Sequence, residues 1–189
     1  MSTHVVTPLF VAHYPSLFEP KLNKLSGKTE YSVRAHFPKG ADLSNLQNAI
    51  KEAVVKVWGD KPPKGLRNPL RDQGELMRED GSMPEGCEPG AFFLNLKSKD
   101  QPGLVDQNRE PIIDSQMIYG GVWLRASVNA YAYDHAGNRG VSFGLNHIQK
   151  CKDAPSVGGG KGRPQDAFGM FDDGTPGGKK PVTSDDMFS

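Results

Sequence analysis

The sequence has few of the residues and motifs that most functional classes need. Its two cysteines, Cys87 and Cys151, stand far apart and outside any CxxC spacing, so neither a disulfide framework nor a tetrahedral zinc site is expected. The N-terminus lacks a basic segment followed by an apolar run, and no apolar run approaches the ~20 residues that cross a bilayer. We therefore expect a soluble protein of the reducing cytoplasm, without a membrane partner.

Catalytic motifs are missing as well. The chain contains no GxSxG, HExxH, P-loop or Rossmann glycine pattern, and GGGKG at 158–162 lacks the phosphate-loop spacing. Its five histidines include no pair at i, i+4. We therefore expect no enzyme, no catalytic residue, no bound metal ion and no cofactor. A metal-dependent nuclease assembled from distant carboxylates is the less favoured alternative.

A strong charge of one sign is also absent. The formal net charge is +1, which argues against a histone-like protein. The 22 glycines and 15 prolines indicate many turns, long loops and a disordered part. The 189 residues are enough for one sizeable core with segments left over.

What the sequence does contain is alternation of apolar and polar residues, which is typical of half-buried strands. Five principal strands are expected, at residues 5–13, 30–37, 91–99, 122–133 and 140–150. The segment PSLFEP is expected to end the first strand, DHAGN to form a hairpin turn, and residues 103–113 to add a short hairpin. Gly144, inside the last strand, predicts a bulge or a barrel corner.

Residues 42–58 instead repeat apolar side chains every three or four positions, which predicts the only convincing helix. Ser44 with Gln47 has capping-box spacing, Asp42 is the alternative N-cap, and Gly59 supplies a C-terminal stop. We expect the helix to pack on a sheet, with Trp58 in the core. Residues 60–90 are predicted to form a long loop, basic in its first part and acidic in its second.

These elements favour a mainly β fold, either a small barrel or a sandwich. An OB-fold-like five-stranded barrel with one helix, long loops and a disordered C-terminal tail is one member of that set. We expect one domain over residues 1–151 and a Gly/Pro-rich tail over residues 152–189.

The strand at 122–133 has an unusual second face. Its outward positions are Trp123, Arg125, Ser127, Asn129, Tyr131 and Tyr133. Aromatic rings stack on nucleic-acid bases at about 1–3 kcal/mol per base, and arginine or lysine binds phosphates. The less apolar faces of the strands at 30–37 and 91–99 also combine aromatic or histidine rings with basic side chains. The predicted nucleic-acid contacts are therefore Arg34, His36, Phe93, Lys97, Trp123, Arg125, Tyr131 and Tyr133.

Two other interpretations of this face stay open. The helix or a loop could cover it, so that the aromatic residues form a second small core. The protein could also be a non-enzymatic β-protein that binds carbohydrate or protein, although such a site would want more carboxylate and amide groups than this face supplies.

The order of several segments resembles a bacteriophage family. PSLFEP, YSVRAHFPK, NPLRDQGE, KDQPGLVDQNREPI, GGVWLRASVNAYAYD and GNRGVSFGLNHIQKCKD occur as in the OB-fold single-stranded DNA-binding proteins of tailed phages, over most of residues 9–153. The resemblance implies a protein that binds and protects single-stranded DNA during phage replication and recombination, in the host bacterial cytoplasm. The helix departs from the usual OB order, because it precedes the third strand. Homo-oligomerisation stays open.

The C-terminal tip, SDDMFS, carries acidic and aromatic residues together. It resembles the tails by which single-stranded DNA-binding proteins recruit replication or recombination proteins, and the partner-binding residues would be Asp185, Asp186, Met187 and Phe188. It departs from the bacterial version in having only two acids and in ending on Ser189. We also expect the tip to compete with DNA for the aromatic face. An inert solubilising tail is the alternative.

Overall fold

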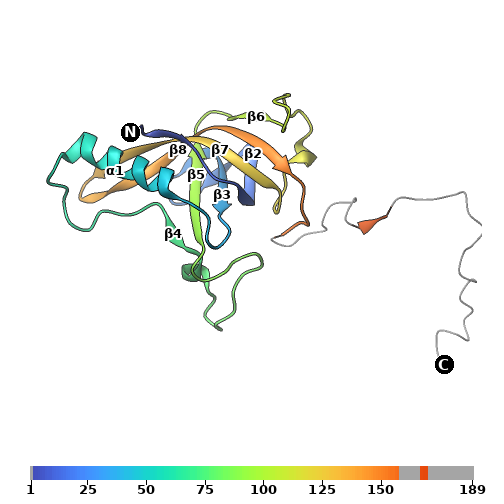
Figure 1. The fold of residues 1–189 in the computed structure, drawn as a ribbon, viewed down its shortest axis with the longest axis horizontal. Coiled ribbons are helices and arrows are strands. Elements are labelled where there is room, and N and C mark those ends of the chain that lie inside the picture. The colour runs from blue at the N-terminus through green and yellow to red at the C-terminus, as the bar shows by residue number, and fades with distance from the viewer. Residues whose placement is uncertain (1, 158–166, 170–189) are drawn as a thin grey trace, which may run out of the picture.

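The computed structural model describes residues 2–157 and 167–169 (Figure 1). The predicted partner-binding residues Asp185, Asp186, Met187 and Phe188 lie outside the described residues. The elements follow one another in the order β1 (His4–Val6), β2 (Phe10–Asn23), β3 (Lys28–His36), α1 (Ser44–Trp58), β4 (Arg71–Asp72), η1 (Gln73–Leu76), β5 (Phe92–Ser98), β6 (Gly103–Val105), η2 (Ser115–Met117), β7 (Trp123–His135) and β8 (Asn138–Lys152).

Five of these strands close into a ring. β2 pairs with β3 and β3 with β5, both antiparallel, and β5 then pairs with β8 in parallel. The ring closes through the antiparallel pairs of β8 with β7 and of β7 with β2. This is the strand order of an OB-fold, so the prediction of a mainly β, OB-fold-like five-stranded barrel is confirmed.

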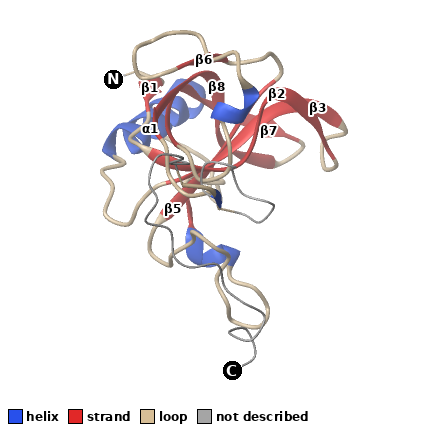
Figure 2. Ribbon diagram, turned by 90° about the vertical axis from the view of Figure 1, so that its right-hand side faces the viewer, coloured by secondary structure: helices blue, strands red, loops and turns tan. Residues whose placement is uncertain are grey.

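The first barrel strand is longer than the sequence suggested. PSLFEP was expected to end a strand at residues 5–13, and this prediction is wrong, because β2 continues to Asn23 (Figure 2). The pairing of β2 with β3 shifts register between His13 and Ser16 and again between Ser16 and Lys21. A proline that cannot donate a hydrogen bond is tolerated at such irregular positions. The strand therefore bends at its prolines instead of stopping.

The helix lies where its periodicity predicts. Its N-cap position is Leu43, without a side-chain cap, while Asp42 accepts the backbone N–H of Ser44 at 3.0 Å. The backbone N–H of Gly59 donates to the carbonyl of Val55 at 2.9 Å, which confirms the expected stop. Leu46, Ala49 and Ala53 are buried against the barrel, whereas Trp58 is only half-buried.

α1 precedes β5, so the departure from the usual OB order that the sequence predicted is present. The helix packs mainly against β7 and β1.

The β7–β8 hairpin forms the longest ladder of the barrel. Its turn places Ala136 and Gly137 at positive φ, 50° and 85°, which confirms the predicted turn. Gly144 pairs with Asn129 of β7 and with Lys97 of β5, the point where the barrel closes. A Cβ at Gly144 would lie 2.9 Å from Oδ1 of Asn129. Gly144 therefore lies at the predicted barrel corner, and a larger residue there would require the Asn129 side chain to move.

Candidate nucleic-acid interface

A groove of about 840 Å³ crosses the outer surface of the barrel where β5, β7 and β8 meet the beginning of the long loop. Its floor includes the rings of Tyr131 and Tyr133, and Tyr131 is 47% exposed. The helix therefore does not cover this part of the outward face of β7. Further side chains that line the groove are Arg67, Arg71, Asn95 and Lys97.

The wall formed by the long loop is fixed to β8 by backbone hydrogen bonds. The N–H of Arg67 donates to the carbonyl of Arg139 at 3.0 Å, and the N–H of Val141 donates to the carbonyl of Arg67 at 3.1 Å. A Cβ at Gly140 would lie 2.8 Å from Cβ of Arg67 and 2.9 Å from Oη of Tyr133. Glycine at position 140 therefore allows the wall and the floor to meet.

A smaller hollow of about 150 Å³ extends the groove toward β2. It shares Asn95 and Lys97 with the groove and adds Tyr14 and Arg34. Tyr14 is 59% exposed and has a φ of 49°, at the register shift of β2. A bulge bends its strand and re-aims a side chain. The irregular part of β2 thus adds a third ring to this surface.

Two carboxylates partly neutralise the cations of the groove. Lys97 Nζ lies 3.7 Å from Oε2 of Glu30, and Arg71 Nη2 lies 2.7 Å from Oε2 of Glu75. Within residues 2–157, no ion pair involves Arg34 or Arg67. Of the three groove cations, Lys97 and Arg71 are therefore paired with a carboxylate and Arg67 is not, while Arg34 in the smaller hollow is likewise without a carboxylate partner among the described residues.

The predicted contacts His36 and Phe93 lie beneath this surface, with exposures of 2% and 0%. Their rings are stacked with centroids 5.8 Å apart, and His13 stacks on His36 at 3.6 Å. Alternation along β5 does point Phe93 outward, but β4 pairs with β5 there and places Arg71 beside it. Neither ring has a face free for a base, while the neighbouring Phe92 is 39% exposed.

Burial determines the charge of the two stacked histidines. It lowers the pKa of His13 to about 4, with a further lowering by the nearby Arg34. Burial likewise lowers the pKa of His36 to about 3, helped by His13 and Arg34. Both rings are therefore neutral at physiological pH, and they do not repel the arginine above them.

Trp123 and Arg125 share the outward face of β7 but do not line the groove. Arg125 lines another hollow of about 270 Å³ together with Val6 and His147, and its Nε donates to Oε1 of Gln149 at 2.6 Å. The ammonium of Lys152 lies 4.6 Å from the centre of the Trp123 ring. Because β7 follows the curve of the barrel, the side chains at its two ends face different directions.

The structure thus brings four of the eight predicted contacts to one surface, namely Arg34, Lys97, Tyr131 and Tyr133. Sequence reasoning missed Tyr14, Asn95, Arg67 and Arg71 as members of it. The basic beginning of the loop was the available signal for Arg67 and Arg71. No signal pointed to Tyr14, since the strand was expected to end beside it.

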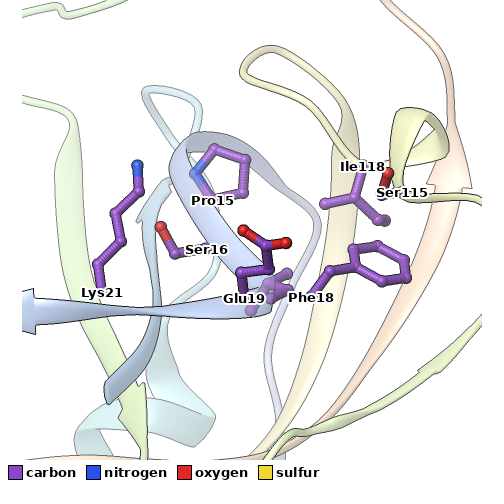
Figure 3. Close-up of a pocket in the computed structure, with 8 residues that line it drawn as sticks. Pro15, Ser16, Phe18, Glu19, Lys21, Ser115 and Ile118 are labelled. Atoms are coloured by element: carbon purple, nitrogen blue, oxygen red, sulfur yellow. The ribbon is translucent and has the colours of Figure 1, made fainter. Parts of the chain in front are cut away.

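Another hollow, of about 340 Å³, lies along the irregular part of β2 (Figure 3). Ser115 and Ile118 face Phe18 across it, and Glu19 and Lys21 give it one charge of each sign. It lacks the combination of several cations with exposed rings.

Among the described residues, no three His, Cys, Asp or Glu side chains could together hold a metal ion. No helix in the described part of the chain is long and apolar enough to cross a membrane.

Comparisons with known proteins agree with this fold. A family model described as "Enterobacter phage Enc34, ssDNA-binding protein" matches residues 3–177. The single-stranded DNA-binding protein of bacteriophage Enc34, solved in complex with ssDNA, superposes with a TM-score of 0.67 at 19% identity, covering 82% of this chain and 90% of that one. Another structure of the same Enc34 protein gives 0.64 at 22% identity, covering 87% and 89%.

The gp2.5 single-stranded DNA-binding protein encoded by bacteriophage T7 gives a TM-score of 0.56 at 18% identity, covering 85% of this chain and 92% of that one. The comparison with curated proteins finds no match.

Proposed function

Because this chain belongs to the Enterobacter phage Enc34 ssDNA-binding protein family, we propose that it binds single-stranded DNA in the groove, largely independently of sequence. The observation that carries the proposal is that the rings of Tyr131 and Tyr133 lie in one groove with three cationic side chains. A ring stacks on any base, and a cation attracts any phosphate, so this combination needs no particular sequence.

The proposed path of the strand begins at Tyr14 and Arg34, crosses Asn95 and Lys97, and reaches the two tyrosines of β7. These side chains line two hollows that share residues, which supports one continuous path. Arg34 and Arg67 suit phosphates, because neither guanidinium has a carboxylate partner among the described residues that a phosphate would first have to displace. Trp123 and Arg125 are proposed as contacts of a longer strand that continues along β7.

In this proposal the protein protects single-stranded DNA during replication or recombination and performs no catalytic step. The acidic and aromatic tip at residues 184–189 recruits replication or recombination proteins, and the host bacterial cytoplasm is the compartment. A carbohydrate site is the less favoured alternative, because the groove holds more cations than a neutral sugar needs.

A titration with labelled oligo(dT) tests this function. Fluorescence anisotropy at about 50 mM and about 200 mM salt should show binding that weakens with salt, by about 0.7 in log–log slope for each phosphate neutralised. Tyr131→Ala with Tyr133→Ala should weaken binding by roughly tenfold or more, at about 1–3 kcal/mol per stacked base. Val57→Ala is the matched control, because it removes an exposed apolar side chain from α1, away from the groove.

Salt-independent binding, or full affinity without the two tyrosines, would contradict the proposal. Incubation of the protein and the same oligonucleotide with Mg²⁺ tests the nuclease alternative, because a nuclease would shorten the oligonucleotide.

A further inference from the structure

Two arginines of the interface share one buried ring. The guanidinium carbon of Arg34 lies 5.4 Å from the centre of the Phe93 ring, and that of Arg71 lies 5.2 Å from it. They arrive from different sides, because Phe93 pairs with His36 of β3 on one side and with Arg71 of β4 on the other. The aromatic face attracts both cations, since its quadrupole is negative.

Each guanidinium is held at one edge as well as on one face. Nε of Arg34 donates to Oδ1 of Asn95 at 3.2 Å, and Nε of Arg71 donates to Oε2 of Glu75 at 2.8 Å. A guanidinium has five N–H donors, so several remain for an anion in the groove. Tyr14 gives Arg34 a second ring at 5.5 Å. Both arginines are therefore oriented before any ligand arrives.

The ring of Phe93 is itself fixed from below. It is 0% exposed and stacks on His36, which in turn stacks on His13. The burial that keeps these two histidines neutral also spares the arginines a like charge beneath them. A ring that is buried and stacked in this way has a defined position, against which both guanidinium groups are placed.

We propose that Phe93 is a positioning residue of the single-stranded DNA interface, which holds Arg34 and Arg71 as a preorganised pair for the phosphates of one strand. The inference rests on the proposed function. In it, Phe93 contributes to the affinity for DNA without contacting DNA. Side chains that must be immobilised on binding cost affinity, and a ring that orders them beforehand removes part of that cost. A core phenylalanine without this role would affect folding stability alone.

A double-mutant cycle distinguishes the two roles. Phe93→Leu keeps an apolar side chain and removes the aromatic face. We expect it to weaken oligo(dT) binding roughly three- to tenfold and to lower the magnitude of the salt slope, by about 0.7 for each phosphate that is no longer neutralised. In a protein that already carries Arg34→Ala and Arg71→Ala, we expect Phe93→Leu to change the affinity by less than about twofold.

The matched control is Phe143→Leu, at a core ring of β8 that is 1% exposed and has no cation over it among the described residues. We expect it to lower the unfolding temperature while leaving the affinity unchanged. Phe93→Tyr, which keeps the ring, should retain the affinity. If Phe93→Leu does not fold, Phe93→Met replaces it in the cycle.

An equal loss of affinity in both backgrounds would overturn the inference, as would a Phe93→Leu protein that binds as tightly as the parent. In either case oligo(dT) still binds the unaltered protein, and the proposed function stands. Failure of the unaltered protein to bind oligo(dT) would instead refute the proposed function and the inference together.

Discussion

The carboxylate of Glu30 lies 3.7 Å from the ammonium of Lys97 inside the groove, so one charge of the interface is held by the protein itself. Glu30 also accepts a hydrogen bond from Asn23 at 3.0 Å and is the more buried partner, with its side chain 18% exposed against 47% for Lys97. A phosphate that approaches Lys97 must therefore compete with a well-anchored carboxylate.

Glu30→Gln is expected to tighten oligo(dT) binding at low salt by roughly two- to fivefold, because an exposed ion pair contributes about 0–1 kcal/mol. The gain should shrink as salt rises. Anisotropy titrations at both salt concentrations measure it. Glu88→Gln is the control. It removes the same negative charge from a surface ion pair with Lys39 outside the groove, and so measures the effect of the change in net charge alone. An equal gain in both variants would show that Lys97 is not a phosphate contact.

Gly140→Ala should separate the wall of the groove from its floor. The added Cβ would lie 2.8 Å from both Cβ and the carbonyl oxygen of Arg67. Overpacking of this kind costs about 1–3 kcal/mol of stability, and the displaced Arg67 should weaken DNA binding as well. Thermal unfolding and anisotropy measure the two effects. Gly169→Ala, which meets nothing within 4 Å, is the control.

Unchanged stability in the Gly140→Ala protein would mean that the loop wall yields to the new methyl group at no cost.

The fluorescence of Trp123 should report the length of the bound strand. Trp123 lies eight residues from Tyr131 along β7, which is roughly 26 Å at about 3.3 Å per residue. Short oligo(dT) should therefore bind in the groove without quenching, and quenching should begin within the range of about 4–16 nucleotides that one OB-fold covers. Trp58, half-buried at the end of α1, should contribute little.

Trp123→Phe is the control, because it should abolish the quenching. Quenching by the shortest strand that binds would place Trp123 inside the first contact site instead.

Alternation made the barrel predictable, because each long strand has one face in the core. Leu124, Ala126 and Val128 are buried as the pattern requires. Alternation could not predict β2 beyond His13, since the register shifts there change which face each side chain takes. The prolines in that segment predicted the end of the strand, whereas in the structure they lie where the strand bends.

The site was predictable only where its residues lie on strands with regular alternation, and even there not completely, since Asn95 of β5 was missed. Tyr131 and Tyr133 were found through their spacing, and Lys97 through the same alternation on β5. Arg67 and Arg71 belong to an irregular segment. It has no apolar periodicity from which its contacts with particular strands could be predicted. Burial of Phe93 depends on β4, a two-residue strand that leaves no signal of its own in the sequence.

Acid should destabilise the fold through His13 and His36. Their pKa values are lowered from 6.5 to about 4 and about 3 by burial, so the unfolded chain binds protons that the folded one does not. Stability should therefore fall as the pH drops below about 6.5, down to the folded pKa values. At pH 4.5 the loss is on the order of 3 kcal/mol for one such histidine, at 1.36 kcal/mol per pH unit.

Urea unfolding at pH 7.5 and pH 4.5 measures this loss, and His36→Gln should reduce it. An equal loss in a protein that carries both His13→Gln and His36→Gln would assign the acid sensitivity to groups other than these two histidines.

Deletion of residues 182–189 should tighten oligo(dT) binding several-fold at low salt and abolish recruitment of a replication or recombination partner. The described main chain reaches Val157, which bonds to Gly120 and lies near Gly86, close to His13. The sequence predicts a Gly-rich coil beyond it, whose r.m.s. reach of roughly 30 Å is enough to return the tip to the groove. Unchanged affinity of the truncated protein at low salt would show that the tip does not visit the groove.

The attachment of the loop wall has a consequence for how quickly a strand is captured. Arg67 is hydrogen-bonded to β8, Arg71 pairs with β5, and the side chain of Gln73 donates to the carbonyls of Phe37 and Phe92. Opening the wall would break contacts to two barrel strands at once, so the groove is formed before any ligand arrives. If DNA binds there as proposed, association needs no slow rearrangement, and its rate is set by diffusion and by the attraction of the cations for phosphates.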